Sequence, residues 1–155
     1  MEIRKLIINN ATAEIGQGEC PINSNKTKYG KWFGLDGVAW CGIFVSWIYN
    51  KSGVKLPNIG FTNGFAGCIT AVQYFRKTKQ ITLEPKKGDL VFYDFNSDGR
   101  HDHVGIFIDW IDANHFEAIE GNTSLKNQNN GGKVMRRIRT NTGCVFVSPF
   151  ILKTI

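Results

Sequence analysis

The sequence predicts an α+β protein in which N-terminal helices pack on an antiparallel β-sheet of about five to six strands. Two patterns predict it: apolar residues recur at helical spacing in the first half, and strand-like segments follow Pro85 and Gly88. The composition, 42% hydrophobic and 21% charged, is ordinary for a folded protein. The 155 residues fit one domain over 1–155, either alone or as the N-terminal module of a longer protein.

Three helices are expected in the first half. The first covers residues 2–15, where isoleucine and alanine recur every four positions and glycines follow. The next segment, 16–37, contains five glycines and a proline and is expected to be a loop. The second helix runs from about 39 to 52 and the third from about 64 to 77. Cys68 lies on the apolar face of the third helix and is expected to pack in the core.

The second half is expected to form the sheet. Its apolar and β-branched segments are separated by glycine and polar residues, as in short strands with turns. The predicted strands are 89–95, 103–110, 115–122, 133–139 and 144–150.

Charge and cysteine content narrow the partners. The chain carries 19 Lys and Arg against 13 Asp and Glu, a net charge of +6, which favours polyanions such as nucleic acid, anionic lipid or a cell wall. The basic residues are scattered, so nucleic acid is not expected as the partner. No apolar run approaches the ~18–20 residues of a membrane span, and no signal peptide is recognised, so we expect synthesis in the cytoplasm with reduced cysteines.

Cys41 is the candidate nucleophile. It is expected in the first turn of the second helix, where the positive end of the helix dipole stabilises a thiolate. Gly42 beside it would let a substrate approach the backbone closely. Because Cys41 also lies on an apolar face, core packing is the alternative interpretation.

His103 is the candidate base for this thiol. If the second and third predicted strands form a hairpin closed by a four-residue loop at Trp110 to Ala113, the numbers of paired residues sum to 223. His103 then faces Glu120, which would orient the imidazole, and Asn122 lies diagonally on the same face.

These residues lie in segments that resemble the cysteine, histidine-dependent amidohydrolase/peptidase (CHAP) domain of phage and bacterial peptidoglycan hydrolases. The related NlpC/P60 hydrolases share the placement of the thiol on a helix and the histidine on a strand, so an NlpC/P60-type endopeptidase is an alternative. The Glu120-Gly121-Asn122 segment favours CHAP. The matching segments are 40–45 (WCGIFV), 87–92 (KGDLVF), 102–106 (DHVGI) and 119–123 (IEGNT).

The resemblance implies a papain-like fold with Cys41 as nucleophile, His103 as base, Glu120 as orienting carboxylate and Asn122 as an assisting group. The implied activity is hydrolysis of a peptidoglycan amide, at either the N-acetylmuramoyl–L-alanine bond or a stem or crossbridge peptide bond. A phage endolysin acting on a Gram-positive wall, with a wall-binding domain elsewhere in the full protein, fits the basic charge and the absence of a leader. Three aromatic residues would line the substrate groove: Trp40, Trp32 and Tyr29.

The segment before His103 resembles most of an EF-hand calcium loop. Oxygen-bearing residues occupy positions 1, 3, 5 and 9, and glycine occupies position 6, but position 12 is Gly105 instead of glutamate. A polar turn is the alternative interpretation. The expected calcium ligands are Asp94, Asn96, Asp98, the carbonyl of Arg100, and Asp102.

A second function class stays open. A non-catalytic module could bind a wall or nucleic acid through its positive charge alone. Such a module has no need of Cys41, His103 and Glu120 together, which favours the enzyme.

Overall fold

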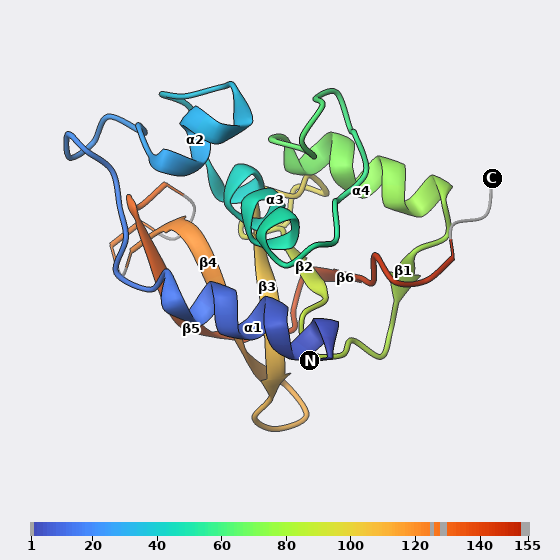
Figure 1. Ribbon diagram of the computed structural model, residues 1–155. Coiled ribbons are helices and arrows are strands. Elements are labelled where there is room, and N and C mark those ends of the chain that lie inside the picture. Colours follow the sequence, from blue (N-terminus) through green and yellow to red (C-terminus); the bar gives the residue numbers. More distant parts are fainter. Residues whose placement is uncertain (1, 125, 128–129, 153–155) are drawn as a thin grey trace.

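The structure is a computed structural model that describes residues 2–124, 126–127 and 130–152. Over these residues the chain folds into four helices and six strands, and the α+β prediction is confirmed (Figure 1). The helices are α1 (Ile3–Ala13), α2 (Lys28–Phe33), α3 (Cys41–Lys51) and α4 (Cys68–Lys77). The strands are β1 (Ile81–Thr82), β2 (Leu90–Tyr93), β3 (His103–Trp110), β4 (His115–Thr123), β5 (Lys133–Thr140) and β6 (Cys144–Val147).

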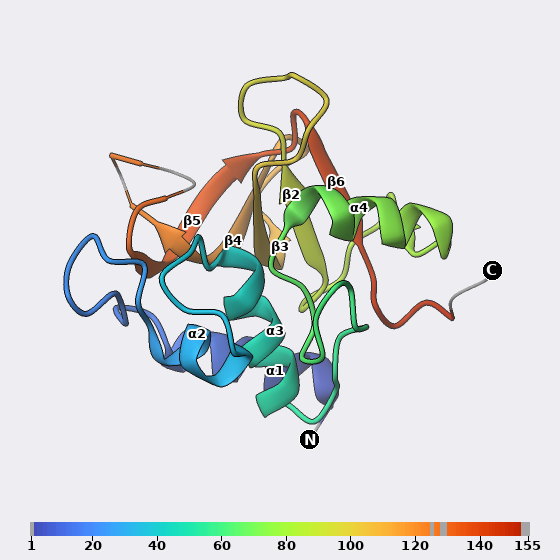
Figure 2. The same ribbon diagram turned by 90° about the horizontal axis from the view of Figure 1, so that it is seen from above.

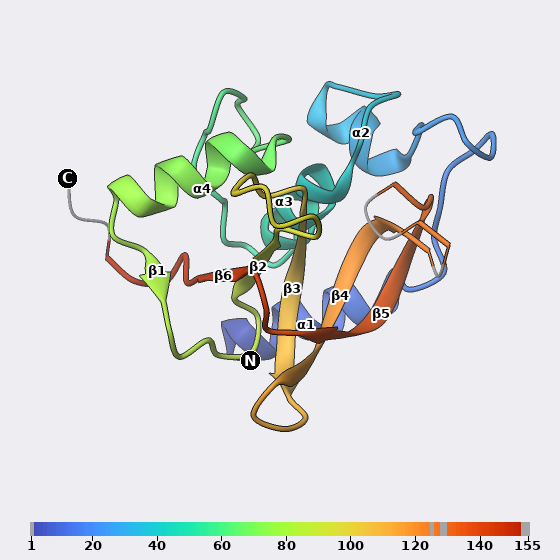
Figure 3. The ribbon, with the colours of Figure 1, turned by 180° about the vertical axis from the view of Figure 1, so that it is seen from behind.

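The strands form one antiparallel sheet in the order β1-β6-β2-β3-β4-β5. Figure 3 shows this sheet from the side away from most of the helices, with β1 and β5 at opposite edges. Figure 2 shows the helices gathered on the other side. The sheet therefore buries one face under the helices, as expected for its class.

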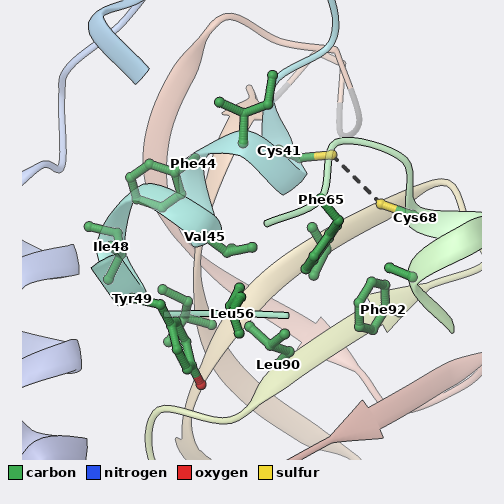
Figure 4. Packing of buried hydrophobic residues seen from close by; sticks show 14 of the residues in the cluster. Cys41, Phe44, Val45, Ile48, Tyr49, Leu56, Phe65, Cys68, Leu90 and Phe92 are labelled. Atoms are coloured by element: carbon green, nitrogen blue, oxygen red, sulfur yellow. Dashed lines mark hydrogen bonds between the residues drawn. The ribbon is translucent and has the colours of Figure 1, made fainter. Parts of the chain in front are cut away.

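Helix α3 is the centre of the core. It packs against β3 and β4 and also contacts α1 and α2. Its apolar residues are buried on nearly all sides, so α3 is a core helix and not an amphipathic surface helix. Figure 4 shows Phe44, Val45 and Ile48 of α3 among residues from the β2 strand and the 56–68 segment.

The sequence patterns did not predict two short elements, helix α2 and strand β1. Helix α2 lies inside the segment expected to be a loop, where Thr27 caps it by accepting a hydrogen bond from the Gly30 amide at 3.1 Å. Strand β1 has only two residues, too few for a periodicity to be visible. Within the described residues, no helix is long and apolar enough to cross a membrane.

Asp89 links the first helix to the sheet. Its side chain is 1% exposed and accepts hydrogen bonds from Arg4 Nη1 at 2.7 Å and from the Lys86 amide at 2.8 Å. Its backbone oxygen accepts from the Phe107 amide at 2.8 Å. This carboxylate therefore holds α1 and the turn before β2 together.

We expect Asp89→Ala to lower the free energy of unfolding by about 2–3 kcal/mol, because it removes a buried carboxylate that accepts charge-assisted hydrogen bonding from Arg4 and a bond from the Lys86 amide. The matched control is Asp109→Ala, since Asp109 pairs with Lys87 at 3.4 Å but both side chains are more than half exposed. Denaturant titration should show a loss below about 1 kcal/mol for the control. Equal losses for both variants would contradict this role of Asp89.

Candidate active site

Cys41 occupies the first residue of α3, where the sequence placed it. The side chain is 4% exposed, and its Sγ lies at the positive end of the helix dipole. In the described structure the first turn of α3 contains no acidic residue and its N-cap makes no side-chain hydrogen bond, so no carboxylate of this turn offsets the positive end. The position favours an ionised thiol.

A second thiol, that of Cys68, contacts the Cys41 thiol. Cys68 Sγ lies 3.9 Å from Cys41 Sγ, and Cys68 is itself the first residue of α4 (Figure 4). The expected core packing of Cys68 is confirmed, since it is 7% exposed and belongs to the main core cluster. Its contact with the candidate nucleophile was not predicted, because the helix was expected to begin four residues earlier.

Gly42 makes this contact possible. A Cβ on Gly42 would lie 2.7 Å from the Ala66 carbonyl oxygen and 3.0 Å from the Phe65 ring. The missing side chain therefore admits the segment that leads into α4 and brings Cys68 to Cys41. The expectation that this space receives substrate is wrong, because the protein's own backbone fills it.

His103 and Glu120 form a buried pair. His103 Nε2 lies 3.0 Å from Glu120 Oε1, and both side chains are fully buried. The other ring nitrogen, Nδ1, is buried and makes no hydrogen bond within the described residues. The predicted hydrogen bond between imidazole and carboxylate is therefore present.

The register that produces this pair differs from the predicted one. Ile106 pairs with Ile119, so the residue numbers sum to 225 and not to 223, and the pairing shifts by one between Phe107 and Asp109. Continued toward the start of β3, this register places Glu120 opposite Gly105, two residues from His103. A Cβ on Gly105 would lie only 2.6 Å from Glu120 Cγ, so this glycine gives the carboxylate its space.

Arg139 completes the site from β5. Its Nε donates to Glu120 Oε2 at 3.0 Å and its Nη2 donates to Oε1 at 2.5 Å, a two-point contact with the carboxylate. Its guanidinium lies over the rings of Tyr93 and Phe95, 5.1 and 4.9 Å from their centroids. Arg139 was not predicted as a site residue, although its alternation with Arg137 on a predicted strand was a usable signal.

Charge coupling shifts the pKa values of these groups. Burial would raise the pKa of Glu120, but the hydrogen bonds from Arg139 and His103 outweigh it and lower the pKa to about 2. Burial would lower the pKa of His103, but the charge of Cys41 and then the hydrogen bond and charge of Glu120 raise it to about 9. The hydrogen bond from Cys68 is the strongest influence on Cys41 and, with the His103 charge, holds the pKa of Cys41 well below its usual value despite burial.

At neutral pH these directions give a Cys41 thiolate beside a His103 imidazolium. This ion pair is the resting state that cysteine-dependent acyl transfer requires.

Asn122 lies beside the pair with its side chain fully buried. Its backbone has φ 58°, the left-handed conformation that asparagine tolerates better than most residues. The β4–β5 pairing shifts between Glu120 and Thr123, around this residue. Continuing the β3–β4 register places Asn122 opposite His103, and its role as an assisting group stays a prediction.

Two of the three aromatic residues that were predicted to line the substrate groove are buried in the core. Trp40 is 0% and Tyr29 is 1% exposed, and their rings stack with centroids 5.6 Å apart. The Tyr29 hydroxyl donates to Glu14 at 2.8 Å. These two residues belong to the core, so the prediction that they contact substrate is wrong, while Trp32 is half-buried and remains a candidate.

The predicted calcium loop joins β2 to β3 at the surface. Asp94 accepts hydrogen bonds from the amides of Asp98 and Gly99, at 3.2 and 2.8 Å. Asp98 accepts from the Arg100 amide at 2.8 Å, and Asp102 from the Phe95 amide at 3.2 Å. Among the described residues, no three His, Cys, Asp or Glu side chains converge on a common point that could hold a metal ion. The loop's carboxylates therefore cap its own backbone, and calcium binding stays a prediction.

A core helix that begins at a thiol, facing a sheet that supplies histidine and carboxylate, defines the papain-like class of cysteine hydrolase folds. The chain matches the NlpC/P60 family over residues 27–144 and belongs to that family. The family is the one that the sequence analysis named as related to CHAP, and CHAP membership itself stays a prediction.

The solved structures that resemble the chain include RipD from Mycobacterium tuberculosis. The match has a TM-score of 0.52 and 18% identity, and it covers 96% of this chain and 98% of RipD. RipD is described as a non-catalytic NlpC/p60 domain protein adapted to peptidoglycan binding. At this identity the likeness shows the fold alone. No curated protein matches the sequence.

Nuclear magnetic resonance titration of His103 tests the ion pair. We expect a pKa of about 9 in the wild type and a lower value in Cys41→Ala, because the thiolate charge that raises it is gone. The raised pKa also stabilises the fold, fully below pH 6.5 and progressively less as the pH rises through 9. The same pKa in both proteins would show that Cys41 does not interact with the ring.

Removing Arg139 tests the support of Glu120. Arg139→Leu should cost about 3–5 kcal/mol of folding free energy, because it leaves a buried carboxylate without its cation. The low pKa of Glu120 stabilises the wild type above the ordinary value of 4.5 and loses this effect as the pH falls through about 2. Acid unfolding of the variant should therefore begin at a higher pH.

The matched control for this variant is Arg136→Leu on the same strand. Arg136 pairs with Glu117 at 3.2 Å in a partly exposed position, so its loss should cost at most about 1 kcal/mol. If both variants unfold in acid at the wild-type pH, Arg139 does not hold Glu120 ionised.

Proposed function

We propose that the chain is a cysteine-dependent peptidoglycan hydrolase that cleaves an amide bond. The observation that carries the proposal is the chain of contacts from Arg139 through Glu120 to His103, beside a thiol at a helix N-terminus. A binding module gains nothing from a buried, ionised histidine and carboxylate, which are costly to desolvate. Membership in the NlpC/P60 family supports peptidoglycan as the substrate.

The reaction follows from the resting charges. The Cys41 thiolate attacks the carbonyl carbon of the amide, and the His103 imidazolium gives its proton to the leaving nitrogen. The acyl group is then held as a thioester on Cys41. Neutral His103 removes a proton from water, which attacks the thioester and restores the thiolate and imidazolium.

The tetrahedral intermediate needs donors for its oxyanion. Helix α3 begins at Cys41, and the first amides of a helix have no intrahelical acceptors. These amides are the proposed donors to the oxyanion. Glu120 keeps the imidazole ring in place and stabilises its charged form. Asn122 is proposed to assist from the adjacent position of β4.

The basic charge supports a more specific proposal. A net charge of +6 favours an anionic Gram-positive wall, and a phage endolysin with a CHAP-type specificity is the biological role that we propose. The scissile bond would be either the N-acetylmuramoyl–L-alanine amide or a peptide bond of the stem or crossbridge. Calcium at the 94–102 loop would support activity by ordering the start of β3, since Asp102 precedes His103.

Peptidoglycan binding without cleavage is the second candidate function. The near-complete burial of Cys41 and His103, at 4% and 0% exposure, favours it because a substrate has little access to either group. The non-catalytic description of RipD shows that this fold can serve binding alone.

Digestion of purified peptidoglycan separates the two functions. We expect the wild type to release fragments and to clear a suspension of Gram-positive cells, and Cys41→Ala to lose at least about 1,000-fold in rate while it remains folded. Cys20→Ala and Cys144→Ala are matched controls, because Cys20 is exposed and the pKa of Cys144 is raised to about 12 by burial. Mass spectrometry of the fragments identifies the bond. Sedimentation of the protein with peptidoglycan in the absence of released fragments would favour binding alone.

A further inference from the structure

The two buried thiols form a pair that the proposed hydrolysis does not need. Cys41 and Cys68 lie 27 positions apart in the sequence, yet their sulfurs are 3.9 Å apart (Figure 4). Each is the first residue of its helix, so α3 and α4 direct their N-termini toward the same point. Two helix dipoles therefore favour negative charge on this sulfur pair.

The pair is suited to unequal roles. Cys68 donates a hydrogen bond to Cys41, which lowers the pKa of Cys41 and raises that of Cys68. Cys41 is thus the thiolate that attacks an oxidant, and Cys68 is the thiol that remains protonated beside it. Both side chains are below 10% exposed, so only a small oxidant reaches them.

We infer that Cys41 and Cys68 form an oxidation site, in which Cys68 resolves an oxidised Cys41 as a reversible disulfide. This inference rests on the proposed role of Cys41 as a reactive thiolate. The sulfurs must close by about 2 Å to reach the bond length of a disulfide. Gly42, whose missing side chain admits the 65–67 segment, lets the α4 terminus make this approach.

Hydrogen peroxide is the oxidant that we propose for this site. The Cys41 thiolate attacks one peroxide oxygen, the O–O bond breaks, and hydroxide leaves, so that Cys41 becomes a sulfenic acid. The Cys68 sulfur then attacks the Cys41 sulfur and the S–O bond breaks. The hydroxyl takes the Cys68 proton and leaves as water, and a dithiol later reduces the disulfide by exchange.

The disulfide switches hydrolysis off and protects the nucleophile. While the Cys41 sulfur is bonded to Cys68, it cannot attack a carbonyl, and it cannot be oxidised further to the irreversible sulfinic acid. Without Cys68, a sulfenic Cys41 has no thiol in contact with it among the described residues, where Cys68 supplies that thiol at 3.9 Å.

Peptide mapping tests the inference directly. The full chain is treated with hydrogen peroxide, free thiols are blocked with iodoacetamide, and trypsin releases peptides 32–51 and 56–76, each with a single cysteine. We expect these two peptides to be joined, with a mass lower than their sum by two hydrogen atoms. Dithiothreitol should separate them and restore unmodified Cys41.

Cys68→Ser is the decisive variant, and Cys144→Ser is its matched control. After the same treatment, Cys68→Ser should carry sulfinic Cys41 that dithiothreitol does not recover, whereas the control should form the disulfide as the wild type does. Unlinked peptides in the wild type, or full recovery of Cys41 in Cys68→Ser, would overturn the inference.

The peptide map does not depend on hydrolysis. If the two peptides are joined but the protein releases no peptidoglycan fragments, the oxidation site is supported and the proposed hydrolase is rejected. Fragment release that continues unchanged after peroxide, with unlinked peptides, would retain the enzyme and reject the oxidation site.

Discussion

The two-point contact of Arg139 with Glu120, continued by the bond from Glu120 to His103, places three ionisable groups almost out of reach of water. Each of these groups would be costly to bury alone, and each is stable here only because the next one offsets its charge. The surroundings follow from this constraint. Gly105 leaves space for the carboxylate, and the aromatic ring of Tyr93 covers the guanidinium. The hydrogen bond from Cys68 and, at the end of this chain of charges, the charge of His103 hold the pKa of Cys41 well below its usual value.

Much of this arrangement was visible in the sequence, because periodicity and alternation depend on local spacing. The helices around Ile7 and Phe44 and the five longer strands were predicted, and so was the shared sheet face of His103 and Glu120. The register was wrong by two, an even number, so the face was preserved while the partner changed. The error arose at the hairpin loop, because Trp110 pairs with Phe116 instead of lying in the loop, and the one-residue bulge after Phe107 then reduced the error from three to two.

The missed features depend on contacts between distant segments. Arg139 lies 19 residues from Glu120, and Cys68 lies 27 from Cys41, so neither partner could be identified by spacing alone. The prediction that Trp40 lines a substrate groove failed because closeness in sequence did not mean a shared surface. Trp40 lies next to the nucleophile in sequence, but a helix N-cap residue can point away from the adjacent side chain, and Trp40 is wholly buried in the core.

The central claim is that the hydrogen bond from Cys68 and the buried charge of His103 favour a Cys41 thiolate. The pH dependence of iodoacetamide alkylation measures this directly when each cysteine is followed in its own tryptic peptide. We expect the alkylation rate of Cys41 to reach its plateau at a lower pH than that of a free cysteine peptide, whose thiol has the ordinary pKa of about 8.5. A Cys41 profile that coincides with the profile of the free cysteine peptide would contradict the account.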